Sequence, residues 1–267
     1  MNKGIFVKND DKLLRLKCIF ALSKSSLINS PIKFGKLFKF PELVIQYLNE
    51  LKMAKSSKKT IILTDVANVI DALGISVVTQ CAHLAAWEAA TGNIAPAHAI
   101  IVEEARQDLL LNRRKWNEEE LKMQFVSAVL RASQVSIPDK VAVFYERPLV
   151  GTIQGYSFSV ICDCMIATPT HGGRPKAPYF FLQEFKKGKG DKLDAEAQVL
   201  VAMLLAQVQN KDEKPLYGAW LMGESWYFTI LNGNEYCVSE TLNSTDASHL
   251  NKIIYMLQHL KTLILNR

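Results

Sequence analysis

Apolar positions along the first part of the chain follow the spacing of amphipathic helices. They recur every three or four residues over 65–73, 79–90 and 96–112, and this spacing predicts three helices. Gly74 and the run Thr91-Gly92-Asn93 separate these stretches, as helix ends commonly do. The first part of the chain is therefore predicted to be mainly helical.

Residues 116–267 mix helical and extended patterns. Asn117 can cap a helix that ends near Ser133, and three glutamates fill its first turn, where negative charge suits the helix dipole. Three β-rich runs, a helix, a hairpin, a short strand and a final helix follow at 140–145, 156–167, 179–187, 191–209, 217–231, 235–239 and 246–265. This order predicts an α/β (α+β) domain over 116–267, preceded by a basic, mainly helical region over 1–115.

The third β-rich run is apolar on both faces, which predicts a central strand in a sheet covered on both sides. Glu184 and Lys186 lie on one of these faces, where burial is costly without compensation. On the preceding strand, we expect Asp163 to point to one face and both Cys162 and Cys164 to point to the other. A divalent cation between the carboxylates of Asp163 and Glu184 would supply the compensation. Mg²⁺ prefers oxygen ligands and keeps several waters, one of which can attack a phosphodiester.

Asp163, twenty intervening residues and Glu184-Phe185-Lys186 resemble the catalytic core of the PD-(D/E)XK nuclease superfamily. A glutamate-bearing helix before the strands and a hairpin over 217–231 strengthen the resemblance. It covers roughly residues 115–240 and says nothing about residues 1–100. It implies a restriction-endonuclease-like core, in which helices flank a central mixed β-sheet.

The resemblance also implies roles for the residues that carry it. Asp163 and Glu184 would bind Mg²⁺ or Mn²⁺, and the main-chain carbonyl of Phe185 would be a further ligand. Lys186 would orient the attacking water and offset the charge that develops in the transition state. The implied function is a metal-dependent nuclease, which hydrolyses phosphodiester bonds of DNA or RNA.

Other positions match the superfamily less closely. Glu118 and Glu119 lie on different faces of the preceding helix, and either could approach the metal. Gln198 occupies the place where many members have a helical glutamine. Cys162 stands where the proline of the superfamily name would be. Glu146, at the end of the first strand, is a further candidate ligand.

The Glu-x-Lys triplet has little specificity by itself. It also occurs at Glu50-Leu51-Lys52 and Glu120-Leu121-Lys122, both on predicted helices. An alternative is that Asp163, Glu184 and Lys186 form a buried ion-pair network in a catalytically inactive module of the same fold, which binds nucleic acid or a protein partner. A third alternative is an unrelated α/β protein whose basic first segment contacts protein partners.

Basic residues near the Glu-x-Lys strand are candidates for contacts with a nucleic acid, with DNA expected before RNA. Lys187, Lys189 and Lys192 follow the strand, and Arg174 lies in the loop before it. Solvated loops explain these charges as well. Cleavage of two strands by one site per chain would suit a homodimer.

The amino-acid composition limits the classes of protein to which the chain can belong. Hydrophobic residues make up 49% of the 267 positions and charged residues 22%, as in ordinary globular proteins. No apolar run reaches the roughly 20 residues of a membrane span, and charges interrupt any signal-peptide core, so we expect no membrane partner and a cytoplasmic protein. Five cysteines without C-x-x-C spacing predict reduced thiols and no zinc site.

The net charge of +6 is concentrated in the first segment. Residues 1–60 contain 13 Lys and Arg against 4 Asp and Glu, a net +9, and the remaining 207 residues contain 19 against 22, a net −3. A helix is predicted over 41–52 and a linker over 55–59. Such a segment can bind a polyanion, although a solvated basic face explains it equally well.

Overall fold

The computed structural model describes residues 60–187 and 192–266. The chain divides into two units, Met1–Ser56 and Ser57–Arg267, and the second contains all the described residues. The predicted helix over 41–52, the linker over 55–59 and Lys189 lie outside the described residues.

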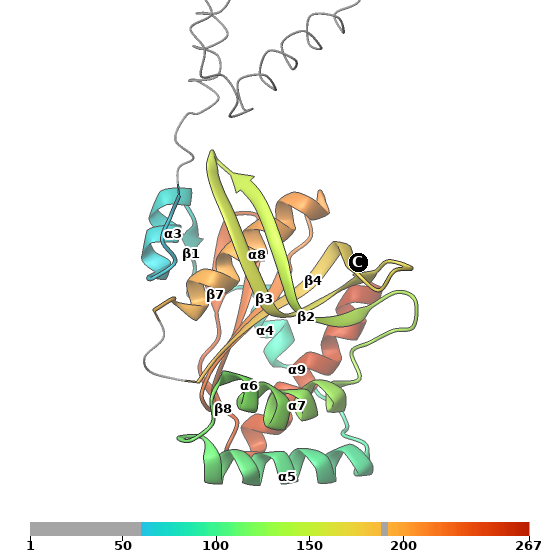
Figure 1. The fold of residues 1–267 in the computed structure, drawn as a ribbon. Coiled ribbons are helices and arrows are strands. Elements are labelled where there is room, and N and C mark those ends of the chain that lie inside the picture. Colours follow the sequence, from blue (N-terminus) through green and yellow to red (C-terminus); the bar gives the residue numbers. More distant parts are fainter. Residues whose placement is uncertain (1–59, 188–191, 267) are drawn as a thin grey trace, which may run out of the picture. The chain divides into compact units, whose positions relative to one another are not determined.

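A mixed sheet of eight strands forms the centre of the described unit (Figure 1). The neighbour order is β1-β7-β6-β5-β4-β3-β2, and β8 pairs with β6. The β4–β5 and β1–β7 pairs are parallel and the others antiparallel, which confirms the predicted mixed sheet. The strands are β1 Ser76–Val77, β2 Ala142–Ile153, β3 Tyr156–Pro169, β4 Pro175–Lys186, β5 Leu216–Met222, β6 Ser225–Asn232, β7 Glu235–Val238 and β8 Leu242–Asn243.

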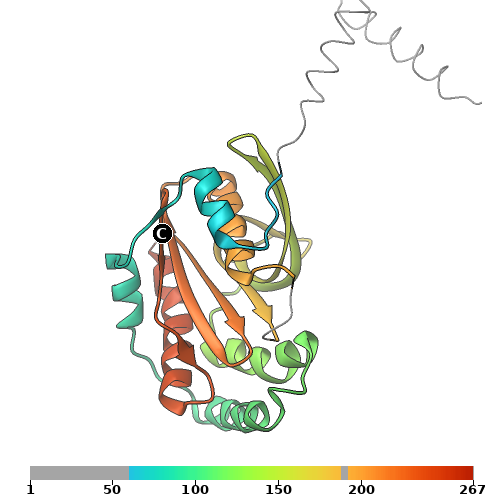
Figure 2. The same cartoon turned by 90° about the vertical axis from the view of Figure 1, so that its left-hand side faces the viewer.

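Helices cover both faces of this sheet (Figure 2). Leu182 of β4 packs in a core with α3 and α8, whereas Phe185 packs in a second core with α4, α5, α7 and α9. The prediction that β4 is a central strand covered on both faces is therefore confirmed. The helices are α3 Val66–Leu73, α4 Ala82–Glu88, α5 Pro96–Asn112, α6 Glu118–Leu121, α7 Ser127–Ser133, α8 Ala195–Asn210 and α9 Ala247–Leu265, with a π-helical turn, η2 Lys122–Val126, between α6 and α7.

Capping residues explain where several helices begin and end. Asp65, Asp194 and Asp246 accept hydrogen bonds from the first free main-chain N–H groups of α3, α8 and α9, respectively. Asn117 caps α6 within a reciprocal capping box, as its position before three glutamates predicts. Gly74 ends α3 in the left-handed region, with φ of 65°.

Helices α3, α4 and α5 belong to the same compact unit as the sheet. The Trp87 ring of α4 lies 6.3 Å from Phe181 and 5.0 Å from Phe228, and its Nε1 donates to the carbonyl of Met256 at 2.7 Å. Leu109 of α5 is fully buried in the same core. The unit boundary at 56/57 thus differs from the predicted division at 115/116, because helical periodicity shows an apolar face but not what covers it.

Strand β3 changes face at Asp163. Cys162 and Met165 pack in the core that contains α8, whereas Cys164 packs in the opposite core. Since residues two apart share a face in a regular strand, the prediction that Cys162 and Cys164 share a face is wrong. On β2, Glu146 lies opposite Asp163, between the residues that pair with Cys164 and Cys162, and has a left-handed φ of 50°. The two strands are irregular at the same level.

Two further predictions can be compared with the described part of the chain. Its four cysteines, Cys81, Cys162, Cys164 and Cys237, are free, and the reduced state of the thiols stays a prediction. Among the described residues, no helix has both the length and the apolar character that a membrane span requires.

Candidate functional site

The carboxylate of Asp163 lies where β3 separates from β4. The main-chain pairing of these strands runs as far as Cys164 opposite Gln183. Beyond this pair, Asp163 Oδ2 accepts a hydrogen bond from the Phe185 N–H at 2.7 Å, in place of a main-chain acceptor. The N–H and C=O of one strand residue point to the same side, so the Phe185 carbonyl faces the same opening as the carboxylate.

Asp163 and Glu184 are both buried, with 6% and 1% of their surface exposed. Burial raises the pKa of Glu184 well above its usual range, and the neighbouring Asp163 raises this pKa further, while Lys186 partly opposes both effects. Burial also raises the pKa of Asp163 against the hydrogen bond from Phe185. Among the described residues, Glu184 Oε1 has no hydrogen-bond partner. The nearby ammonium groups therefore do not fully compensate the negative charge of these two buried carboxylates.

Lys186 connects the acids of the sheet to the glutamate-bearing helix. Its Nζ lies 4.0 Å from Glu184 Oε2 and 3.6 Å from Glu118 Oε2. Only 13% of the Lys186 side chain is exposed, so these charges interact with limited screening by solvent. Strand β4 and helix α6 thus bring together residues that the sequence analysis selected.

A second lysine, Lys122, was not selected from the sequence. Its Nζ lies 2.6 Å from Glu146, 2.7 Å from Glu119, 3.5 Å from Asp163 and 3.8 Å from Glu118. Burial lowers the pKa of Lys122, but the hydrogen bonds to Glu119 and Glu146 outweigh this effect and raise the pKa overall. The spacing of four residues from Glu118 was a local sign of an ion pair, whereas the partners on β2 and β3 were not readable from the helix.

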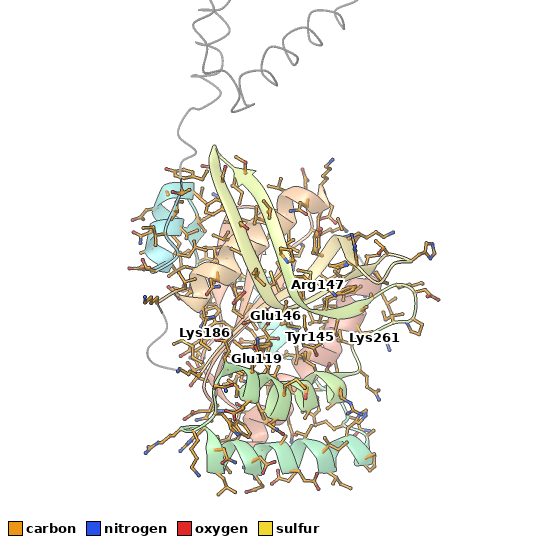
Figure 3. The ribbon with its side chains drawn as sticks, viewed as in Figure 1. Glu119, Tyr145, Glu146, Arg147, Lys186 and Lys261 are labelled. Carbon is orange, nitrogen blue, oxygen red and sulfur yellow. The ribbon has the colours of Figure 1, made fainter. Side chains whose placement is uncertain are left out.

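These side chains converge at the end of the sheet that faces α6. In Figure 3, Glu119, Glu146 and Lys186 extend from α6, β2 and β4 into this region. We call the whole group the acid cluster; it consists of Glu118, Glu119, Glu146, Asp163, Glu184, Lys122 and Lys186. With every group ionised, five carboxylates and two ammonium groups give a formal charge of −3.

The donor set of the acid cluster suits a hard divalent cation. Carboxylate oxygens and a main-chain carbonyl are ligands that Mg²⁺ prefers, and Mg²⁺ commonly keeps several waters. Asp163, Glu184 and the Phe185 carbonyl supply such ligands from two strands. Within the described ranges, no group of three or more His, Cys, Asp and Glu side chains has a metal-binding arrangement.

Gln198 is buried in the first part of α8, the helix that packs on β4. Its Oε1 has no hydrogen-bond partner in the described part of the chain. A functional link between Gln198 and the acid cluster therefore stays a prediction.

The selected basic residues are separated in the structure. Arg174 is exposed in the turn between β3 and β4, at the far end of these strands. Pro169 lies six residues beyond Asp163 along β3, a distance of roughly 20 Å, so the structure does not bring Arg174 to the acid cluster. Lys192 and Lys187 are exposed, and Lys187 directly follows Lys186 of the cluster.

Comparison of the sequence with protein-family models gave no match. A comparison with curated proteins gave no significant match either.

Proposed function

We propose that the chain is a metal-dependent nuclease with a restriction-endonuclease-like core, which hydrolyses phosphodiester bonds of DNA or RNA. The observation that carries the proposal is the meeting of Asp163, Glu184 and Lys186 where β3 separates from β4. The fold supports it, because the strands and helices around these residues occur in the order that the resemblance implies.

Asp163, Glu184 and the carbonyl of Phe185 would hold Mg²⁺ or Mn²⁺. When bound, the ion would activate a water for attack and offset negative charge on the phosphate. The fit to the site rests on the two buried acids and on the unpartnered Glu184 Oε1.

The remaining residues of the acid cluster have supporting roles in this proposal. Lys186 would donate hydrogen bonds from Nζ to the attacking water and to a phosphate oxygen, which offsets the charge that develops in the transition state. Glu118 would position this ammonium group, since its Oε2 lies 3.6 Å away. Lys122 would hold Glu119, Glu146 and Asp163 near one another before a cation binds.

Cleavage assays with purified full-length protein test this proposal. Labelled single-stranded and duplex DNA and RNA would be incubated with Mg²⁺, Mn²⁺ or EDTA. We expect cleavage with a divalent cation, and none with EDTA or with the Asp163→Asn and Lys186→Gln variants. The exposed pair Glu213→Gln and Lys214→Gln provides matched controls of the same charge change. Undiminished cleavage by both site variants would refute the assigned roles.

A second candidate is a non-catalytic module of the same fold that binds nucleic acid. The contacts of Lys122 favour it, because this ammonium group lies 2.6–3.5 Å from Glu119, Glu146 and Asp163 and compensates part of their charge without a metal. Calorimetric titration with Mn²⁺ separates the two candidates. Absence of a bound cation, together with salt-dependent nucleic-acid binding that Glu184→Gln leaves unchanged, would support the module and exclude the nuclease.

The homodimer stays a prediction; it applies to a duplex substrate, in which one site per chain would cut each of the two strands. Sedimentation of the full chain with and without a short duplex measures it directly. A monomer that makes double-strand breaks in a single binding event would contradict it.

A further inference from the structure

A pocket of ≈ 710 Å³ lies between the C-terminal end of α5 and the turn after β5. Four cationic side chains, Arg113, Arg114, Lys115 and Lys187, line it together with one carboxylate, Glu224. We call it the basic pocket. Its volume is in the range of pockets that bind small organic groups, so a nucleotide can enter it.

Two short chain segments join the basic pocket to the acid cluster. Lys187 of the pocket directly follows Lys186 of the cluster, and Asn117 of the pocket directly precedes Glu118. The N–H of Gly223 in the pocket wall donates to the Lys186 carbonyl at 2.8 Å, which fixes the turn beside the end of β4. A polymer bound in the pocket would therefore continue past the acid cluster.

The charges of the two neighbouring regions have opposite signs. The acid cluster has a formal charge of −3 with every group ionised and still −2 with Glu184 protonated, so without a cation it repels a phosphate, whereas the four cations and one carboxylate of the basic pocket sum to +3. Glu224 offsets only Arg113, which it contacts at 3.1 Å. The pocket can therefore supply the attraction for a phosphate backbone that the cluster lacks.

Trp116 gives the basic pocket an aromatic wall. The protein has four tryptophans, and Trp87, Trp220 and Trp226 are buried with at most 4% of their surface exposed. Trp116 is partly exposed and lines the pocket. An aromatic ring beside cations is the arrangement on which unpaired bases stack, whereas the faces of bases inside a duplex are covered by their neighbours.

We propose that the basic pocket binds single-stranded nucleic acid next to the bond to be cut, with one unpaired base stacked on Trp116; this inference rests on the proposed nuclease function. Arg114, Lys115 and Lys187 contact the flanking phosphates. The strand leaves the pocket toward Lys186 and the acid cluster. The preferred substrate is therefore single-stranded nucleic acid or the unpaired end of a duplex.

Binding measured in EDTA tests the pocket without any need for cleavage. The full chain would be titrated into a fluorescent twelve-nucleotide oligothymidylate and into a duplex of the same length, followed by fluorescence anisotropy. Trp116→Leu should weaken single-strand binding by about 5- to 150-fold, the range expected for one stacked base. Trp116→Phe keeps an aromatic face and should retain most of the affinity, and neither variant should change duplex binding.

A double variant tests the phosphate contacts separately. Arg114→Gln with Lys115→Gln should reduce the slope of log affinity against log salt by about 1.4, because each phosphate contact on a single strand contributes roughly 0.7. Lys214→Gln with Lys261→Gln is the matched control, since both lysines are exposed and outside the pocket. The basic segment 1–60 is present in every variant, so its contribution cancels.

The possible outcomes separate the two proposals. If Trp116→Leu binds single strands as tightly as wild type and melts at the same temperature, the proposed role of the pocket is wrong. An equal loss of duplex binding in this variant would also overturn it, because a stacked unpaired base would then not be the contact. If Trp116 governs binding while cleavage with Mg²⁺ or Mn²⁺ is absent, the pocket stands and the proposed nuclease function fails.

Discussion

The acid cluster and the basic pocket are neighbours that differ in the sign of their charge and in how far their charged groups contact one another. In the cluster, Asp163, Glu184 and the two lysines are buried or nearly so, and the lysines contact all five carboxylates, of which Glu119 and Glu146 are exposed. The cations of the pocket line an open surface, where solvent and salt can reach them. Under the proposed function, bond cleavage and substrate affinity would therefore depend on different residues, so variants should change one without the other.

The largest expected effect is on the rate of cleavage. Lys186→Gln should lower the single-turnover rate by about 10²–10³-fold, because it removes a charged donor from the transition state. Its affinity for the oligothymidylate in EDTA should stay within about two-fold of wild type. The comparison breaks if affinity falls in parallel with rate. Lys214→Gln, assayed beside it, should change neither quantity.

Next in size is the loss of the buried ammonium group of Lys122. Removing one partner of a fully buried ion pair costs about 3–5 kcal/mol, and we expect about 1–3 kcal/mol for Lys122→Met because Glu119 and Glu146 are exposed to solvent. Urea denaturation in EDTA measures this loss in the free energy of unfolding. Mg²⁺ should restore part of it, since a cation can compensate the same carboxylates. Equal stability of variant and wild type in EDTA would show that the lysine does not organise the cluster.

The pH dependence of stability should distinguish Glu184 from an exposed acid. Its pKa is raised in the folded protein, so its contribution to stability is complete below its unfolded pKa, near 4, and is lost as pH rises through the folded value. Glu184→Gln removes this loss. The variant should exceed wild type by roughly 1–3 kcal/mol in alkaline EDTA buffer, because wild type then holds a buried, unsatisfied carboxylate.

Urea denaturation of both proteins at pH 5 and pH 9 measures the Glu184 effect. Glu213→Gln is the exposed control and should leave the profile unchanged. Parallel pH profiles for wild type and Glu184→Gln would mean that the Glu184 carboxylate is compensated in the folded protein.

The smallest expected effect concerns the one carboxylate of the basic pocket. Glu224→Gln releases Arg113 from a half-exposed ion pair and adds one positive charge to the pocket. Such pairs contribute about 0.2–1 kcal/mol, so single-strand affinity should rise by no more than about five-fold at low salt and should converge on wild type at high salt. Anisotropy titrations at two salt concentrations measure this change, and a fall in affinity would contradict the assigned role of the pocket.

Local patterns in the sequence predicted those parts of the site that depend on local structure. Strand alternation indicated that Glu184 and Lys186 share a face, and the cap at Asn117 located the helix that presents Glu118. Lys122 was missed because two of its four carboxylate partners, Glu146 and Asp163, lie on β2 and β3, and because a π-helical turn begins at this residue. Contacts between distant segments have no counterpart in helical periodicity.

The residues that the sequence analysis placed wrongly also have a physical explanation. Arg174 was selected because its loop joins the two acid-bearing strands, but β4 begins at Pro175 and not near 179, so the added strand length moves the loop away from the cluster. The faces of Cys162 and Cys164 were misassigned because alternation is interrupted at Asp163. Neither the extra strand length nor the interruption is visible in an alternating hydrophobic pattern.

The left-handed backbone of Glu146 sets thermal stability against the proposed role of its carboxylate in the acid cluster. A non-glycine residue in the left-handed region costs roughly 1–2 kcal/mol, so glycine at this position should raise the melting temperature. The same replacement would remove the carboxylate that contacts Lys122 at 2.6 Å. A mutant library selected for heat resistance should therefore accumulate glycine at position 146, and a library selected for catalytic turnover should retain the acid.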